Sequence, residues 1–186
     1  GIAGKATNSI TNVIVSSNVT IEGSSYSGGV TGETTGSITN ATVSNDVTIK
    51  GSSYSGGITG ETTGSITNAT VSNNVIILST GVTVKKLSSI YVGGIAGKTS
   101  NSITNVKVTG SNIGNGNITM EVSSSSIFEK RCNNYYVGGI AGYTNNIVAS
   151  NDELVSNDST IKGGKILVNR KHRYRWSNIY WRNNRL

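Results

Sequence analysis

The 186-residue sequence contains no proline and only one cysteine, one histidine, one methionine and one phenylalanine. A single cysteine supports neither a disulfide framework nor a cysteine-based metal site. No apolar run approaches the roughly 20 residues that a membrane-spanning helix needs, so we expect no transmembrane segment. Helix-forming residues are scarce, and no window keeps an apolar period of 3.6 residues. Helices are therefore not expected.

Residues suited to catalysis are also few. Nucleophilic catalysis needs a base beside a Ser, Thr or Cys, but the only histidine, His172, lies near the C-terminal end and Cys132 lies in a variable insert. Paired carboxylates could support glycosidic chemistry. Glu33 and Glu61 should stack about 4.8 Å apart, and Asp152-Glu153 is a lone acidic pair, but neither has a companion His, Arg or metal-ligand set. We predict no enzymatic activity and no catalytic, cofactor-binding or metal-binding residues.

What the sequence does contain is repetition. Residues 23–45 and 51–73 are identical at 22 of 23 positions, and the one change replaces Val30 by Ile58. The repeated units open on a glycine at residues 1, 29, 57, 94 and 139, with spacings of 28, 28, 37 and 45. Such self-similarity predicts stacked units, each taking up extra residues in loops on one side.

Each unit holds three short runs rich in Ile, Val and Thr and bounded by Gly, Ser or Asn, as at residues 55–60, 65–71 and 47–49. These are signals for strands and turns. Strands this short are unstable as isolated hairpins, but each gains partners above and below when the units stack. We therefore predict an all-β fold, a right-handed parallel β-solenoid of about five rungs with Gly-rich turns, because parallel crossovers overwhelmingly take that hand.

Equivalent positions should form vertical columns. An inward column is predicted nine residues after each opening glycine, at Ile10, Ile38, Ile66 and Ile103. Two residues later lies an asparagine, at Asn12, Asn40, Asn68 and Asn105. This position favours a ladder of amide hydrogen bonds between rungs, although asparagine also suits a turn conformation there.

Glycine pairs recur at residues 28–29, 56–57, 93–94 and 138–139. They indicate either positive φ angles at a corner or a wall where two backbones approach closely. The spacing Gly29-x-x-Gly32-x-x-x-Gly36 superficially resembles a phosphate-binding loop. No Lys-Ser/Thr pair and no helix pattern follow it, so we predict no phosphate site.

Tyr91-Val-Gly-Gly-Ile-Ala-Gly97 and Tyr136-Val-Gly-Gly-Ile-Ala-Gly142 resemble the GLUG-motif repeats. The resemblance covers about residues 1–145. GLUG repeats occur in large secreted or surface-anchored bacterial proteins, including adhesin-like proteins and the stalk regions of IgA-protease-type metallopeptidases. The resemblance implies a β-solenoid on the cell surface, and it implies no active site because the motif is structural.

We divide the single domain into the repeat solenoid (1–145), a degraded last unit (146–164) and a basic aromatic tail (165–186). Residues 1–164 hold nine Lys/Arg and nine Asp/Glu, whereas the tail holds seven Lys/Arg and no acid, so the whole net charge of +7 lies in the tail. Basic residues among aromatics at 170–176 could bind nucleic acid or anionic lipid. We prefer another interpretation. One possible set of codons for residues 180–185, when it is read one nucleotide later, encodes Ile-Gly-Gly-Ile-Thr, which resembles the opening of a repeat unit. The tail would then be an out-of-frame or disordered copy of a sixth unit, with no specific nucleic-acid partner.

Two inserts, at residues 78–90 and 110–134, break the 28-residue rhythm and should protrude from one side of the solenoid. Residues 82–87 could add an extra strand. Loops on a rigid scaffold commonly carry recognition, but we favour neutral insertions here.

These observations predict a non-catalytic scaffold fragment of a bacterial cell-surface or secreted protein, acting as an adhesin-like stalk or as a binding surface for host or cell-surface glycans or proteins. We expect an extracellular or cell-surface location, with the export signal absent from this fragment. An alternative is a spacer in an IgA-protease-type metallopeptidase, which a flanking His-Glu-x-x-His would identify. A polysaccharide-active β-helix and an ice-binding face are less favoured. Ice binding would use Thr11, Thr39, Thr67 and Thr104, but the next threonine column, Thr34, Thr62 and Thr99, is broken by Ala6.

Overall fold

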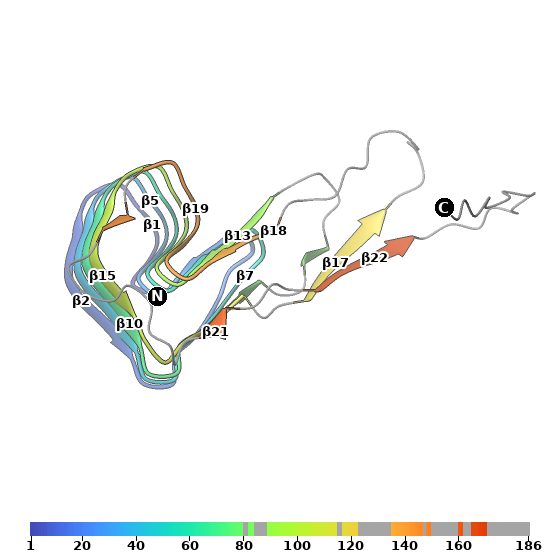
Figure 1. Ribbon diagram of the computed structural model, residues 1–186, viewed down its shortest axis with the longest axis horizontal. Coiled ribbons are helices and arrows are strands. Elements are labelled where there is room, and N and C mark those ends of the chain that lie inside the picture. The colour runs from blue at the N-terminus through green and yellow to red at the C-terminus, as the bar shows by residue number, and fades with distance from the viewer. Residues whose placement is uncertain are drawn as a thin grey trace, which may run out of the picture.

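The structure is a computed structural model that describes residues 1–79, 82–83, 89–114, 117–122, 135–146, 148–149, 160–161 and 165–170. Every regular element in these ranges is a β-strand, and each strand pairs in parallel with its counterpart in the neighbouring turn, as β6, β10 and β15 do. Four sheets enclose one coil, and a fifth lies beside it (Figure 1). The predicted all-β solenoid is therefore confirmed.

Each of the first four turns contributes one strand to each of sheets A to D, in that order along the chain, and the described part of the fifth turn contributes to sheets A to C. Sheet A consists of β1 (Ala3–Ala6), β5 (Thr31–Thr34), β9 (Thr59–Thr62), β14 (Ala96–Thr99) and β19 (Ala141–Thr144). Sheet B consists of β2 (Ile10–Ser16), β6 (Ile38–Ser44), β10 (Ile66–Ser72), β15 (Ile103–Val108) and β20 (Val148–Ala149). Sheet C consists of β3 (Thr20–Glu22), β7 (Thr48–Gly51), β11 (Ile76–Ser79), β16 (Asn112–Ile113) and β21 (Thr160–Ile161). Sheet D consists of β4 (Tyr26–Gly28), β8 (Tyr54–Gly56), β13 (Ile90–Gly93) and β18 (Tyr135–Gly138).

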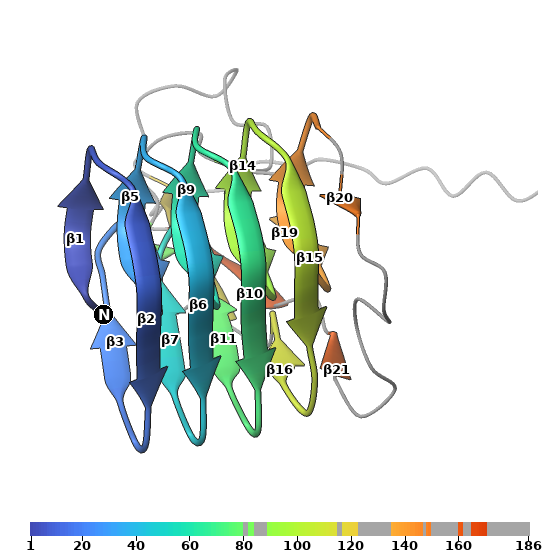
Figure 2. The same cartoon turned by 90° about the vertical axis from the view of Figure 1, so that its left-hand side faces the viewer.

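The coil is right-handed, as the sequence predicts. In Figure 2 the strands of sheet B at the front run downward, while β1 and β3 behind them run upward. Successive turns advance to the right in the same view, and this combination defines a right-handed winding. The hand agrees with the strong preference of parallel crossover connections.

The core is a set of vertical columns of equivalent aliphatic side chains. Ile38, Ile66 and Ile103 pair in register and are each 0% exposed, and Ile10 extends the column with a partly buried side chain. The predicted inward isoleucine column is thus confirmed. Parallel columns are formed by Val43, Val71 and Val108, by Ile49, Ile77 and Ile113, and by Val30, Ile58 and Ile95.

The asparagine ladder is also confirmed, and both physical explanations apply to it. Asn40 donates its side-chain amide to Asn12 Oδ1 at 2.9 Å, Asn68 donates to Asn40 Oδ1 at 3.0 Å, and Asn105 donates to Asn68 Oδ1 at 2.5 Å. The same four residues have φ angles of 51° to 55°. Asparagine is one of the few residues that tolerate this left-handed conformation, and its amide can bond to an identical neighbour.

These two roles can be separated at Asn68. We expect Asn68→Gly to lower the free energy of unfolding by about 1 kcal/mol, because the amide bonds are lost while the left-handed backbone is kept. Asn68→Ala should cost about 1 kcal/mol more, because alanine also strains that backbone. Urea unfolding of both variants measures the difference. Equal stabilities for the two variants would show that the φ angle contributes nothing.

The glycine pairs are explained by close approach of backbones. Among the described glycines only Gly110 and Gly114 have positive φ angles, so the interpretation of the pairs as positive-φ corners is wrong. A Cβ atom on Gly29 would instead collide with the carbonyl oxygen of Gly57 and lie 2.6 Å from Val43 Cγ2. The absence of a side chain is what lets adjacent turns pack at this corner.

The inserts and the tail supply a separate parallel sheet, sheet E. It contains β12 (Val82–Thr83), β17 (Asn117–Val122) and β22 (Lys165–Arg170), of which β17 and β22 lie to the right of the coil in Figure 1. The predicted extra strand is confirmed at residues 82–83, and residues 84–87 lie outside the described residues. Residues 165–170 of the tail pair with β17, whereas residues 171–186 lie outside the described residues.

The boundaries of the inserts differ from the prediction. Residues 78–79, 90 and 112–113 belong to β11, β13 and β16 of the coil, so the departures from it are shorter than residues 78–90 and 110–134. The degraded unit at 146–164 still supplies β20 and β21, which extend sheets B and C to a fifth turn.

Candidate functional site

A column of stacked tyrosines runs along sheet D. Tyr26, Tyr54, Tyr91 and Tyr136 pair in register, and their ring centroids are 4.7, 5.1 and 5.0 Å apart with interplanar angles of 14°, 18° and 4°. The spacing follows from the separation of neighbouring strands. Because the ring faces cover one another, the column presents ring edges to its surroundings, and a free ring face is expected only at an end.

A charged column runs along sheet A. Lys5, Glu33, Glu61, Lys98 and Tyr143 pair in sequence from turn to turn. Lys5 Nζ lies 3.1 Å from Glu33 Oε1, and Lys98 Nζ lies 2.7 Å from Glu61 Oε1. Glu33 and Glu61 do stack as predicted, but each carboxylate is paired with a lysine rather than forming a stripe of acids alone.

The tyrosine column and the charged column meet. Lys98 Nζ lies 5.7 Å from the ring centroid of Tyr54. Tyr143 packs edge-on against Tyr91 and Tyr136, with ring centroids 5.9 and 6.2 Å apart. We call the combined surface of the two columns the tyrosine–charge face. It is the most extensive arrangement of aromatic and charged side chains in the described part of the chain.

The tyrosine–charge face should make the folded chain less stable at alkaline pH. Burial, followed by the negative charge of Glu61, raises the pKa of Tyr26 and of Tyr54. The hydrogen bond to Glu61 raises the pKa of Lys98. A group whose pKa is raised on folding contributes stability below its unfolded pKa and loses that contribution as the pH rises through the folded pKa.

We therefore expect the melting temperature to be insensitive to these groups at neutral pH and to fall above about pH 10, where unfolded tyrosine ionises. Phenolate absorbance and thermal unfolding, measured together across this range, test the effect. Tyr54→Phe removes one titrating hydroxyl and should reduce the alkaline loss. An unchanged pH profile in Tyr54→Phe would contradict the assignment of the loss to this column.

Among the described residues, one buried hydroxyl has no hydrogen-bond partner. Ser27 Oγ donates to the carbonyl oxygen of Lys50 at 2.9 Å, whereas Ser55 Oγ, which is also buried, has no hydrogen-bond partner among the described residues. The next turn has Val92 at the position that pairs with Ser55. The site is therefore one that accepts an apolar side chain.

We expect Ser55→Ala to raise the free energy of unfolding by about 1 kcal/mol, because an unsatisfied buried hydroxyl is removed. The matched variant Ser27→Ala should lower it by about 1 kcal/mol, because a satisfied hydrogen bond is lost. Urea unfolding distinguishes the two signs. Equal destabilisation by both changes would contradict the difference in hydrogen bonding.

The two threonine columns considered for ice binding differ in burial. Thr34, Thr62 and Thr99 are buried, and each hydroxyl donates to a backbone carbonyl two residues later, at 3.3, 3.1 and 3.0 Å. They are not a surface column. The other column is in register on sheet B, where Thr11 is exposed and Thr39, Thr67 and Thr104 are partly exposed.

The glycines whose spacing superficially resembles a phosphate-binding loop pack directly against the backbone of neighbouring strands. A Cβ atom on Gly32 would lie 2.7 Å from the carbonyl oxygen of Gly4, and one on Gly60 would lie 2.6 Å from that of Gly32. These positions face carbonyl oxygens, which repel a phosphate. Their role is to let sheets A and D approach, since a Cβ on Gly60 would also lie 2.9 Å from the Tyr54 carbonyl.

The remaining candidates from the sequence are not brought into a site that the structure describes. Cys132, His172 and Asp152-Glu153 lie outside the described residues. Within the described ranges, no group of three or more His, Cys, Asp or Glu side chains could hold a metal ion. The same ranges contain no helix long and apolar enough to cross a membrane.

Comparison with protein-family models matches residues 88–114 to the GLUG motif. No curated protein and no solved structure matches the chain. The matched segment contains β13, β14, β15 and β16, which together make one turn of the coil. Together, the stacked turns and this match define a repeat-type domain in which one GLUG motif corresponds to one turn.

Proposed function

We propose that this chain is a non-catalytic repeat scaffold of a bacterial cell-surface or secreted protein, acting as an adhesin-like stalk or binding surface. The observation that carries the proposal is the constancy of register. Sheet B pairs Ile38 with Ile66 across a spacing of 28 residues and Ile66 with Ile103 across a spacing of 37. Extra residues leave the coil without disturbing the stack, so the number of turns can change while each turn keeps its neighbours.

The chemistry of the described side chains supports a scaffold rather than an enzyme. Glu33 and Glu61 are each within 3.1 Å of a lysine. The buried threonine hydroxyls donate to backbone carbonyls. Each of these groups therefore has a partner within the coil, as expected of side chains that hold a stacked scaffold together.

The tyrosine–charge face is the surface that best suits a partner. It offers ring edges of tyrosines together with the exposed Lys5–Glu33 pair. Such a surface recognises proteins or glycans mainly through hydrogen bonds, because the ring faces that would stack on a sugar are covered along the column. Tyrosine is enriched at protein interfaces whereas Lys and Glu are depleted there, so the tyrosine edges are the part of this face that best suits a contact.

Inserting one additional turn tests the scaffold role. A second copy of residues 29–56, placed after Gly56, should lengthen the coil by about 4.8 Å and raise the midpoint of urea unfolding, because one more interface is added. A scrambled copy of the same 28 residues is the matched control. Loss of cooperative unfolding on insertion of the true copy would overturn the proposal.

Location needs a separate test. Antibodies against the chain should label intact source cells or the culture medium. Labelling only after lysis would refute the surface assignment. A His-Glu-x-x-His motif encoded in the flanking gene sequence would instead reassign the chain as a spacer in a secreted metallopeptidase.

A further inference from the structure

The tyrosine column of sheet D holds phenol rings in neighbouring pairs. The rings of Tyr54 and Tyr91 stack with their centroids 5.1 Å apart and their planes inclined by 18°, and each ring also stacks on a second neighbour, Tyr26 or Tyr136. The side chains leave paired positions of parallel strands and the rings are nearly parallel, so equivalent ring atoms are separated by about the same distance as the centroids. An ortho carbon of one ring therefore lies over an ortho carbon of the next.

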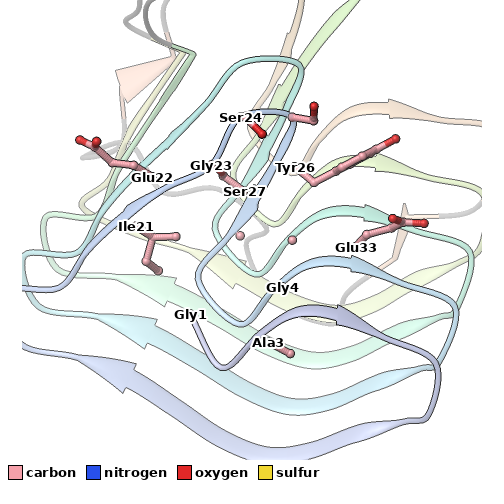
Figure 3. Close-up of a pocket in the computed structure, with 13 residues that line it drawn as sticks. Gly1, Ala3, Gly4, Ile21, Glu22, Gly23, Ser24, Tyr26, Ser27 and Glu33 are labelled. Atoms are coloured by element: carbon pink, nitrogen blue, oxygen red, sulfur yellow. The ribbon is translucent and has the colours of Figure 1, made fainter.

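The column lies on the outer side of the coil. Tyr26 is 37% exposed, and Tyr54, Tyr91 and Tyr136 are partly exposed. The residue that follows each of these tyrosines along its strand packs toward the core, as the alternation of side chains in a strand requires. In Figure 3 the Tyr26 ring and the Glu33 side chain extend to the same side of the coil. A small oxidant in solution can therefore reach the rings without entering the core.

A disulfide cannot join two turns of this coil, because the chain has one cysteine. A phenol offers a different covalent bond. Loss of one electron and one proton converts it into a phenoxyl radical, whose unpaired electron is shared with the two ortho carbons. Two such radicals on facing rings can combine at these carbons. Because the fold holds the rings side by side, the combination is intramolecular and is favoured over reaction between separate molecules.

We propose that the tyrosine column is a site of oxidative cross-linking, in which a peroxidase and hydrogen peroxide couple tyrosines of adjacent turns, as at Tyr54 and Tyr91. Each phenol loses one electron and its hydroxyl proton. A carbon–carbon bond forms between two ortho carbons, and the proton on each of these carbons then passes through solvent to the phenolic oxygen, which restores both hydroxyls. The two tyrosines lose two hydrogen atoms in total, and one hydrogen peroxide is reduced to two water molecules.

The order of the column restricts which tyrosines can couple. Tyr26 and Tyr91 lie on opposite sides of Tyr54, so their rings are about two strand spacings apart and cannot meet in the folded coil. Coupling of Tyr54 to Tyr91 joins positions that are 37 residues apart in the sequence. Closing a loop of this kind restricts the unfolded chain and so stabilises the folded one. This chemistry requires stacked rings and does not depend on the stalk role.

The test treats the 186-residue chain with a haem peroxidase and hydrogen peroxide and maps the products by tryptic digestion and mass spectrometry. Trypsin cleaves after lysine, which places the first three tyrosines of the column on separate peptides, residues 6–50, 51–85 and 87–98. Cross-links are predicted between 6–50 and 51–85 and between 51–85 and 87–98. Each product should be two hydrogen atoms lighter than the sum of its peptides. No cross-link is expected between 6–50 and 87–98.

Controls assign the reaction to the folded column. In a mixture of unlabelled and heavy-nitrogen-labelled chains, each cross-link should join peptides of one isotope. Tyr54→Phe keeps a stacked ring but removes a phenol, so every cross-link of peptide 51–85 should be lost while that between Tyr91 and Tyr136 remains. Tyr143→Phe, which changes the ring packed edge-on against the column, is the matched control and should leave the column cross-links intact. Circular dichroism checks that each variant is folded.

The cross-linked chain should also be more stable. Its melting temperature is expected to rise by about 5 to 10 °C over that of the untreated chain. Dithiothreitol should not reverse the rise, because the new bond joins carbon atoms. The rise should be smaller in Tyr54→Phe, which loses the cross-links among the first three turns.

Three results would overturn the proposal. They are absence of dityrosine in the folded chain under conditions that couple free tyrosine, cross-links only between differently labelled chains, and coupling of 6–50 to 87–98 as readily as to 51–85. None of these results changes the outcome expected from inserting an additional turn, so failure here is distinguishable from failure of the scaffold role.

Discussion

Gly60→Ala should lower the free energy of unfolding by about 3 kcal/mol or more, because a methyl group has no room at this position. The added Cβ atom would lie 2.6 Å from the Gly32 carbonyl oxygen, 2.8 Å from the Ser27 nitrogen and 2.9 Å from the Tyr54 carbonyl oxygen. All three atoms belong to the backbone, so the clash cannot be relieved by rotating a side chain. Relief requires sheets A and D to separate, which disrupts the turns above and below.

The same column provides a matched control. Gly4 occupies the equivalent position in the first turn, but nothing lies within 4 Å of a Cβ atom built on it. Gly4→Ala should be neutral or should stabilise by about 0.5 kcal/mol, because alanine restricts the unfolded chain. Urea unfolding of the two variants tests the explanation. Similar effects at the two sites would show that the cost comes from glycine itself and not from close packing of the sheets.

Ile66→Ala should lower the free energy of unfolding by about 4 kcal/mol. Ile66 is 0% exposed and lies between Ile38 and Ile103, so its removal leaves a cavity that neighbouring turns cannot fill. The effect includes both the lost burial of apolar surface and the cavity.

The matched change is Ile10→Ala at the end of the same column. Ile10 is only partly buried and pairs with Ile38 on one side. The loss there should be smaller, about 1 to 2 kcal/mol, because part of the side chain is already in solvent. Thermal or urea unfolding compares the two variants. An equal loss at Ile10 and Ile66 would contradict the assignment of Ile66 to the centre of a continuous core.

The stacking register could be predicted from the sequence because the units begin alike and differ in length only later. The opening glycine fixes the phase of each turn, so Ile38, Ile66 and Ile103 align although their spacings are 28 and 37 residues. Both explanations that the sequence suggests for the asparagine column also hold in the structure. Amide bonding and a left-handed φ angle are compatible, so the two alternatives for Asn68 did not need to exclude each other.

The tyrosine–charge face was missed, although its signal is present in the sequence. A tyrosine lies two residues before the first glycine of each Gly-Gly pair, and the fourth residue after each opening glycine is in turn Lys, Glu, Glu, Lys and Tyr. Comparing Glu33 with Glu61 alone predicts only a stacked pair of carboxylates, whereas following the position through all five units gives Lys5 and Lys98 as their partners.

Other features depend on contacts that the repeat does not encode. Thr34, Thr62 and Thr99 can be buried because each hydroxyl donates to a nearby carbonyl, and this local bond is not visible in the spacing of threonines. Sheet E joins residues from inserts of unequal length, so β12, β17 and β22 share no repeat phase by which their pairing could be predicted.

The most direct test of in-register stacking is a methyl–methyl nuclear Overhauser experiment on the chain labelled at isoleucine δ1 methyl groups. Direct cross-peaks are predicted between Ile38 and Ile66, which are paired across adjacent strands, and between Ile66 and Ile103. No direct cross-peak is expected between Ile38 and Ile103, which are separated by one strand. Absence of both predicted cross-peaks in the folded chain would contradict the stacking of equivalent side chains on which the coil and the ladders depend.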